Sequence, residues 1–117
     1  MQIADAFVGL RVIEFAQGVA APYCGLLLGR NGADVIKVEP PVKGDWCRGL
    51  GLRKGDFSSE FIVLNRGKKS LALDMKNPDG RAAAFKLASN ADVIIENYRP
   101  SVTKRLGVDY AAVAEVN

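Results

Sequence analysis

The sequence predicts an α/β fold with a mainly parallel sheet of about four strands. Short apolar, β-branched segments alternate with helical segments along the chain, which is typical of a sheet covered by helices. The phrase Ala-Asp-Val-Ile occurs at 33–36 and again at 91–94, and Val-Ile pairs are typical of strands buried on both faces. The length, 117 residues, fits one domain with a modest core.

The first part of the chain predicts a strand, a helix and a second strand. Residues 10–15 are rich in apolar and β-branched side chains and predict the first strand. The helix that follows has Pro22 in its first turn and Asn31-Gly32 at its end. Residues 33–39 predict the second strand. A unit of this length fits a parallel strand–helix–strand crossover.

The middle of the chain predicts a long irregular segment. Residues 40–57 contain two prolines and four glycines, so they form either a functional loop or a mobile one. The spacing Gly49-x-Gly51-x-x-x-Gly55 does not join a strand directly to a helix. It therefore predicts a flexible loop rather than a dinucleotide-binding turn. Trp46 either packs on a ligand or anchors this loop.

The second half of the chain repeats the alternation of helices and strands. Asn77-Pro78-Asp79 signals a helix start, because it supplies a cap, a proline for the first turn and an acid at the positive end of the helix dipole. The predicted elements are a short helix at 58–68, a strand at 70–75, a helix from 77 to about 90, a strand at 91–96, a helix at 101–107 capped by Ser101, and a last segment capped by Asp109.

Ligands of open α/β sheets bind outside the carboxyl ends of the strands. The segments predicted there carry Gly, Pro, Asn or basic residues, and together they indicate a rim for an anionic ligand. Two basic clusters, 66–69 and 99–105, either form solvated faces or join Lys76 in a polyphosphate site. Asn97 and Tyr98 either cap a strand or hydrogen-bond and stack on a purine. Asp34 and Asp92 enter strands at the opposite edge of the sheet, which predicts structural roles for both.

Composition argues against several classes of function. The net charge is only +3 and no five-residue run is purely basic, which argues against a nucleic-acid partner. No apolar stretch approaches the roughly 18–20 residues of a membrane span. Cys24 and Cys47 lack metal-ligand spacing, so we expect no metal and a reducing, cytoplasmic location.

No catalytic group is predicted from the residues themselves. Histidine is absent, which removes His-based dyads and triads and most zinc sites. Glu14, Glu39 and Glu96 end predicted strands, but no partner acid or base is apparent in the sequence. Cys24 fits a small packing residue better than a nucleophile. The residues therefore indicate a binding half-site without a reactive group.

Three ordered motifs resemble the N-terminal part of the class III CoA-transferases. That family includes formyl-CoA and carnitine CoA-transferases and α-methylacyl-CoA racemase. The motifs are LRVIEFAQGVAAPYCGLLLGRNGADVIKVEPPVKGDWCRG (10–49), LNRGKKSLALDMKNPDGR (64–81) and ADVIIENYRPSVTKRLGVDY (91–110). The resemblance spans about residues 9–117. It implies that residues 1–117 form one Rossmann-like, three-layer CoA-binding domain that is incomplete relative to the family.

By this resemblance the chain binds CoA or acyl-CoA as a substrate. The loop 18–20 would lie near the thioester, and some relatives have an adenine-contacting arginine where this chain has Pro40. The implied CoA-binding residues are Val19, Ala20, Leu73, Asp74, Met75, Lys76, Asn97, Tyr98, Arg99 and Arg105.

The family chemistry moves CoA between carboxylic acids through an acyl-aspartyl anhydride, and racemase relatives use an Asp and a His. The resemblance places these catalytic residues beyond the matched segment, so we expect the chain alone to be inactive. We also expect a homo-oligomer or a partner chain that carries the missing C-terminal part. The alternatives are a non-catalytic module that self-associates through open strand edges, a racemase fragment, and an unrelated mononucleotide-binding α/β domain.

Overall fold

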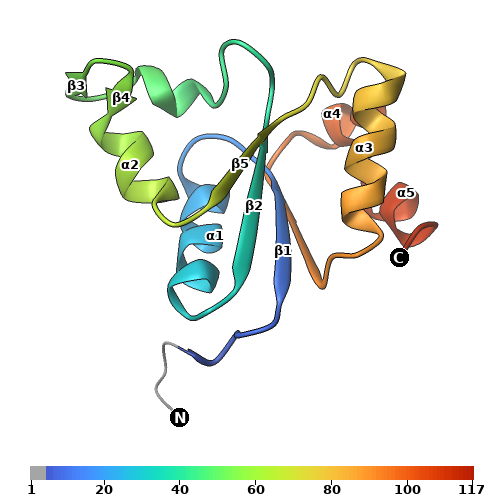
Figure 1. The fold of residues 1–117 in the computed structure, drawn as a ribbon. Helices are drawn as coiled ribbons and strands as arrows, with labels where there is room; N and C mark the ends of the chain where they lie inside the picture. The colour runs from blue at the N-terminus through green and yellow to red at the C-terminus, as the bar shows by residue number, and fades with distance from the viewer. Residues whose placement is uncertain (1–4) are drawn as a thin grey trace.

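The computed structural model describes residues 5–117, and its central feature is a four-stranded parallel sheet (Figure 1). Residues 1–4, which the predicted domain includes, lie outside the described part. The strands are β1 (Arg11–Phe15), β2 (Asp34–Glu39), β5 (Lys69–Ala72) and β6 (Val93–Glu96), in the order β5-β2-β1-β6. Taken in chain order, these strands have the order 3-2-1-4 of a doubly wound sheet, which reverses between β1 and β6. The predicted α/β fold with a parallel sheet is therefore confirmed.

Helices cover both faces of the sheet and make three layers (Figure 1). On one face, Val12 and Val35 pack with Ala21 of the first helix. On the other face, Ile13 and Val38 pack with helical and loop residues from the second half of the chain. The first layer contains α1 (Ala20–Arg30) and α2 (Ser59–Asn65), and the other contains α3 (Pro78–Ala88), α4 (Pro100–Leu106) and α5 (Tyr110–Ala114). Side chains alternate between the two layers because successive residues of a strand point to opposite faces.

The two aspartates of the repeated phrase hold the amino-terminal edge of the sheet. Asp92 Oδ2 accepts a hydrogen bond of 2.8 Å from the backbone N–H of Arg11, at the start of β1. Asp34 forms an ion pair with Lys69, with 2.7 Å between Oδ1 and Nζ. Both contacts join neighbouring strands, so the predicted structural roles are confirmed.

The ends of the later helices show which local signals operate. Asn77 Oδ1 accepts from the backbone N–H of Asp79 at 2.9 Å, and Gly107 ends α4 in the left-handed region at φ 73°. Ser101 does not cap α4, and that prediction is wrong. Pro100 occupies the first helical position instead, because its fixed φ suits that position and its missing N–H costs nothing there.

The segment 40–57 is more ordered than the sequence predicts. It contains a short 3₁₀ helix, η2 (Trp46–Gly49), and a hairpin of two strands, β3 (Arg53–Lys54) and β4 (Phe57–Ser58). Gly55 lies in the hairpin turn at φ 60°, a region that favours glycine. Two-residue strands have no detectable periodicity, which is why the hairpin was not predicted. Within residues 5–117, no helix is long and apolar enough to cross a bilayer.

Candidate functional site

A cavity of about 210 Å³ opens at the carboxyl ends of the strands. Its walls come from the ends of β1, β2 and β5, from the segment after β6 and from α4, so it lies at the edge where ligands of such sheets bind. We call it the rim cavity. Six of the predicted binding residues line it: Leu73, Asp74, Met75, Lys76, Tyr98 and Arg105.

The lining of the rim cavity combines apolar walls with cations. Phe15, Val38 and Leu106 supply apolar surface, and Tyr98 adds an aromatic ring. Burial raises the pKa of Tyr98, so its phenol keeps its proton at neutral pH. Lys76 and Arg105 line the same cavity, and both side chains favour phosphate oxygens. The arrangement suits a flat heterocycle that carries phosphate groups.

Asn97 has a structural task that is more specific than the strand capping predicted as one of its two alternatives. Its Oδ1 accepts from the backbone N–H of Gln17 at 3.2 Å, and its Nδ2 donates to the backbone carbonyl of Gln17 at 2.8 Å. These two bonds join the loops that follow β1 and β6. The other predicted residues, Val19, Ala20 and Arg99, are exposed at the starts of α1 and α4 and do not line the rim cavity.

Gln17 is a cavity residue that the sequence analysis did not single out. It lines the rim cavity, and its Nε2 lies 3.3 Å from Tyr98 Oη. The backbone N–H of Trp46 donates to Gln17 Oε1 at 3.4 Å. The Trp46 indole packs against Gly18 so closely that a Cβ atom there would overlap the ring, yet 57% of the residue is exposed. Trp46 therefore anchors the loop, one of its two predicted roles.

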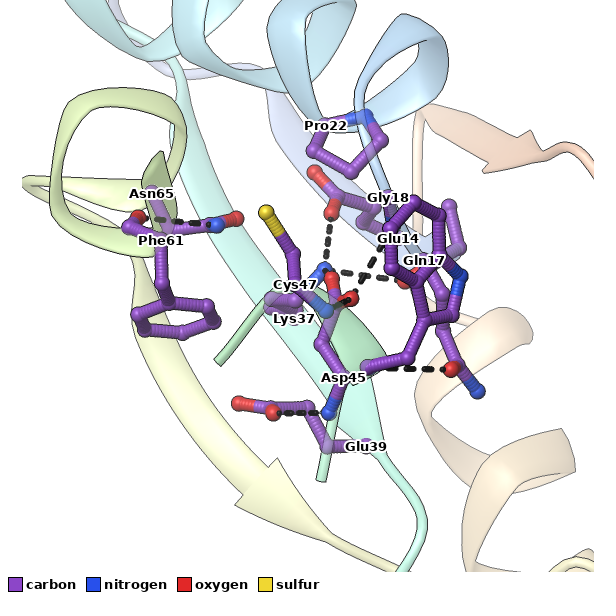
Figure 2. Close-up of polar contacts among 12 residues, drawn as sticks. Glu14, Gln17, Gly18, Pro22, Lys37, Glu39, Asp45, Cys47, Phe61 and Asn65 are labelled. Atoms are coloured by element: carbon purple, nitrogen blue, oxygen red, sulfur yellow. Dashed lines mark hydrogen bonds and ion pairs between the residues drawn. The ribbon is translucent and has the colours of Figure 1, made fainter. Parts of the chain in front are cut away.

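Four buried charged residues form a cluster between the sheet and α1. Figure 2 labels Glu14, Lys37 and Asp45 of this cluster. Glu14 and Lys37 are neighbours in the register of β1 and β2, and Lys37 Nζ lies 2.8 Å from Glu14 Oε1 and 2.9 Å from Asp45 Oδ2. Lys68 Nζ lies 2.7 Å from Glu14 Oε2. We call Glu14, Lys37, Asp45 and Lys68 the buried charge cluster. The prediction that Glu14 has no partner is wrong.

The buried charge cluster fixes the loops at the rim. Asp45 Oδ1 accepts from the backbone N–H groups of Gly18, at 3.0 Å, and Cys47, at 2.8 Å. Burial by itself lowers the pKa of Lys37, but the carboxylates of Glu14 and Asp45 outweigh burial and raise that pKa. Lys37 therefore stays charged and pairs with both carboxylates.

Glu39, at the end of β2, holds the loop that follows it. Its carboxylate accepts from Arg48 Nη2 at 2.7 Å and Nε at 2.8 Å, from the backbone N–H of Asp45 at 2.8 Å and from Ser70 Oγ at 3.1 Å. The Arg48 guanidinium lies 3.7 Å from the centre of the Phe61 ring. Burial alone would raise the pKa of Glu39, but these donors lower it. Glu39 therefore has partners, contrary to prediction, and they fasten the loop after β2 to the sheet.

The first basic cluster does not contribute to the rim. Lys68 is buried beside Glu14, and Lys69 pairs with Asp34 at the opposite edge of the sheet. A signal in the sequence could have revealed the buried charges. Glu14 and Lys37 each lie between two apolar residues of a strand, and charged residues at buried strand positions are almost always paired.

Comparison with known proteins gives the family. The model of CoA-transferase family III matches residues 7–117. The acetyl-CoA:oxalate CoA-transferase of Acetobacter aceti is 40% identical over 111 residues, which are 95% of this chain and 28% of that protein. The formyl-CoA:oxalate CoA-transferase of Rhodopseudomonas palustris (strain TIE-1) is 41% identical over 117 residues, with 98% of this chain and 27% of that protein covered.

Solved structures agree with the sequence comparisons. A CaiB/BaiF family protein from Brucella suis superposes with a TM-score of 0.89 at 35% identity, over 97% of this chain and 31% of that one. The chain thus spans less than a third of the length of the relatives that it matches. The chain belongs to CoA-transferase family III.

Proposed function

We propose that residues 1–117 are a single CoA- and acyl-CoA-binding domain of a class III CoA-transferase, which moves CoA between carboxylic acids. One observation carries the proposal: six predicted binding residues meet around the rim cavity, in a chain of this family. The apolar walls and Tyr98 suit the adenine ring, and Lys76 and Arg105 suit phosphates. The names of the relatives, which are oxalate CoA-transferases, favour a transferase over a racemase.

We propose that the nucleophilic aspartate of the acyl-aspartyl anhydride mechanism lies outside these 117 residues. The aspartates nearest the rim have other contacts. Asp45 is buried beside Lys37, and Asp74 Oδ1 accepts from the backbone N–H of Lys76 at 3.0 Å. The chain alone should therefore not exchange CoA between an acyl-CoA and a carboxylate. Turnover by the purified chain, abolished by substituting one of its own aspartates, would contradict this.

Calorimetric titration with CoA tests the binding part of the proposal. Arg105→Ala should weaken CoA binding about fivefold to tenfold, the usual loss for one charge-assisted contact to phosphate. Lys104→Ala is the matched control, because Lys104 is an exposed neighbour that does not line the rim cavity. Absence of heat at millimolar CoA, in a sample whose circular dichroism shows it to be folded, would refute the proposal.

We infer that the exposed face of α1 is covered by a second copy or by a partner chain that supplies the rest of the family's length. Val19, Tyr23 and Leu27 lie four residues apart on this helix, and all three are exposed, so they form one apolar stripe. A monomeric mass at every concentration in light scattering, with and without partner chain, would contradict this.

Both cysteines are free thiols, which favours the reducing cytoplasm.

A further inference from the structure

A second cavity, of about 400 Å³, lies beside the rim cavity. We call it the side cavity. Its lining includes Lys43 and Gly44 of the loop after β2, Arg53 of the hairpin and Ser70 of β5. Glu39 and Pro40 line both cavities, so the two spaces meet at the end of β2.

The side cavity has unbalanced positive charge. Glu39 and Arg48 line it as a neutral ion pair. The other charged lining residues are Lys43, Arg53 and Asp56, which leave a net charge of one positive. Across residues 5–117, neither Lys43 nor Arg53 lies within ion-pair distance of a carboxylate. Both cations are therefore available to an anionic ligand.

The segments that carry these two cations are held firmly. Lys43 belongs to the loop that Glu39 fastens through the backbone N–H of Asp45. Arg53 is paired in register with Ser58, whose buried Oγ donates to the carbonyl of Cys47 at 2.9 Å. A site built on anchored backbone loses less entropy when it binds a ligand.

We propose that the side cavity binds the 3′-phosphate of CoA, with Lys43 and Arg53 as its cationic ligands. The proposal rests on the proposed function, in which the nucleotide end of CoA occupies the rim cavity. The ribose of CoA carries a diphosphate on its 5′ carbon and a separate phosphate on its 3′ carbon, so the nucleotide needs cations in two directions. Lys76 and Arg105 line one cavity, and Lys43 and Arg53 line the other.

Residue 40 lies where the two cavities meet, and it is a proline in this chain. Pro40 has no charge, but it lines both cavities. The cationic contact near the adenine end would then come from further along the chain, from Lys43 and Arg53.

Titration with CoA and with dephospho-CoA, which lacks only the 3′-phosphate, tests the proposal. The chain should bind CoA about fivefold to tenfold more tightly than dephospho-CoA, as expected for charge-assisted contacts in a partly open site. Lys43→Ala and Arg53→Ala should each reduce this preference, and Asp56→Asn should increase it. Lys54→Ala is the matched control, because Lys54 is an exposed neighbour of Arg53 that lines neither cavity.

The outcomes separate this inference from the proposed function. Equal affinity for the two ligands overturns the role of the side cavity and leaves CoA binding in place. A preference for CoA that survives both alanine substitutions also overturns it. Failure of a folded chain to bind either ligand overturns both proposals. A preference that falls with Lys43→Ala and Arg53→Ala but persists with Lys54→Ala supports the assignment.

Discussion

Replacement of Lys37 by methionine tests the buried charge cluster directly. Methionine keeps most of the volume of the side chain and removes its charge. Lys37 Nζ contacts Glu14 Oε1 at 2.8 Å, Asp45 Oδ2 at 2.9 Å and the carbonyl of Ala16 at 2.8 Å. In the variant, Glu14 keeps Lys68, but Asp45 loses its cation while only its Oδ1 keeps hydrogen bonds.

The expected loss of stability is large because the buried carboxylate of Asp45 is left without its counter-charge. Removing one partner of a buried ion pair typically costs about 3–5 kcal/mol. We expect the free energy of unfolding of Lys37→Met at pH 7 to be lower than that of the wild type by an amount in this range. The total free energy of unfolding of a domain is only about 5–15 kcal/mol. The matched control is Lys69→Met, because the Lys69–Asp34 pair is largely exposed and such pairs contribute about 0–1 kcal/mol.

Urea denaturation followed by circular dichroism measures both variants. The loss in Lys37→Met should shrink as the pH falls from 7 toward 5. The reason is that an unpaired buried carboxylate has a raised pKa, so it takes up a proton in the folded state before it would in the unfolded state. A loss below about 1 kcal/mol at pH 7, or a loss that does not depend on pH, would refute a charged, paired cluster.

Three further predictions concern the same region. The pKa of Glu39 is lowered, so the contribution of its carboxylate to stability is complete above the usual pKa of 4.5 and is lost as the pH falls through the folded-state pKa. The difference in free energy of unfolding between the wild type and Glu39→Gln, measured in urea titrations, should therefore narrow below pH 4.5. Gly25→Ala should lower stability by about 1–3 kcal/mol, because the new Cβ overlaps the buried carboxylate of Glu14. Gly29→Ala is the control, because its Cβ meets only ordinary contacts, and it should raise stability by up to about 1 kcal/mol. Thermal melts compare the two variants. Iodoacetamide should label exposed Cys24 in the native chain and reach Cys47 only after unfolding, since burial and then nearby carboxylates raise the pKa of the Cys47 thiol; equal labelling rates would contradict this.

The fold could be predicted because its signals are local. The cap and proline at Asn77-Pro78 and the glycine at 107 set helix ends within one turn of the chain. Strand assignment depended on apolar, β-branched runs such as 10–15, of which residues 12–15 are buried in the structure, with side chains on both faces of the sheet. The hairpin at 53–58 was missed because its strands are too short to show a period.

The site was predicted only in part, because its contacts join distant segments. The cavity lining at 73–76 follows β5 directly. It could be predicted because ligands of open α/β sheets bind outside the carboxyl ends of the strands. The bond between Asp45 and Gly18 spans 27 residues, and no local pattern predicts it. Asn97 was assigned to the ligand on resemblance, whereas both polar atoms of its side chain hold Gln17.

The links between β1 and β6 also bear on the order in which the protein can fold. Arg11 and Gln17, at the two ends of β1, hydrogen-bond to Asp92 and Asn97, about 80 residues later in the chain. Closing so long a loop is entropically costly and slow compared with forming a single helix. The bonds that join the loop after β1 to Asn97 therefore form only after β6 has docked, when a ribosome has released nearly all of these residues. Nucleotide binding at this rim would report that β6 has docked, and the backbone amide of Gln17 should exchange its hydrogen whenever its bond to Asn97 opens.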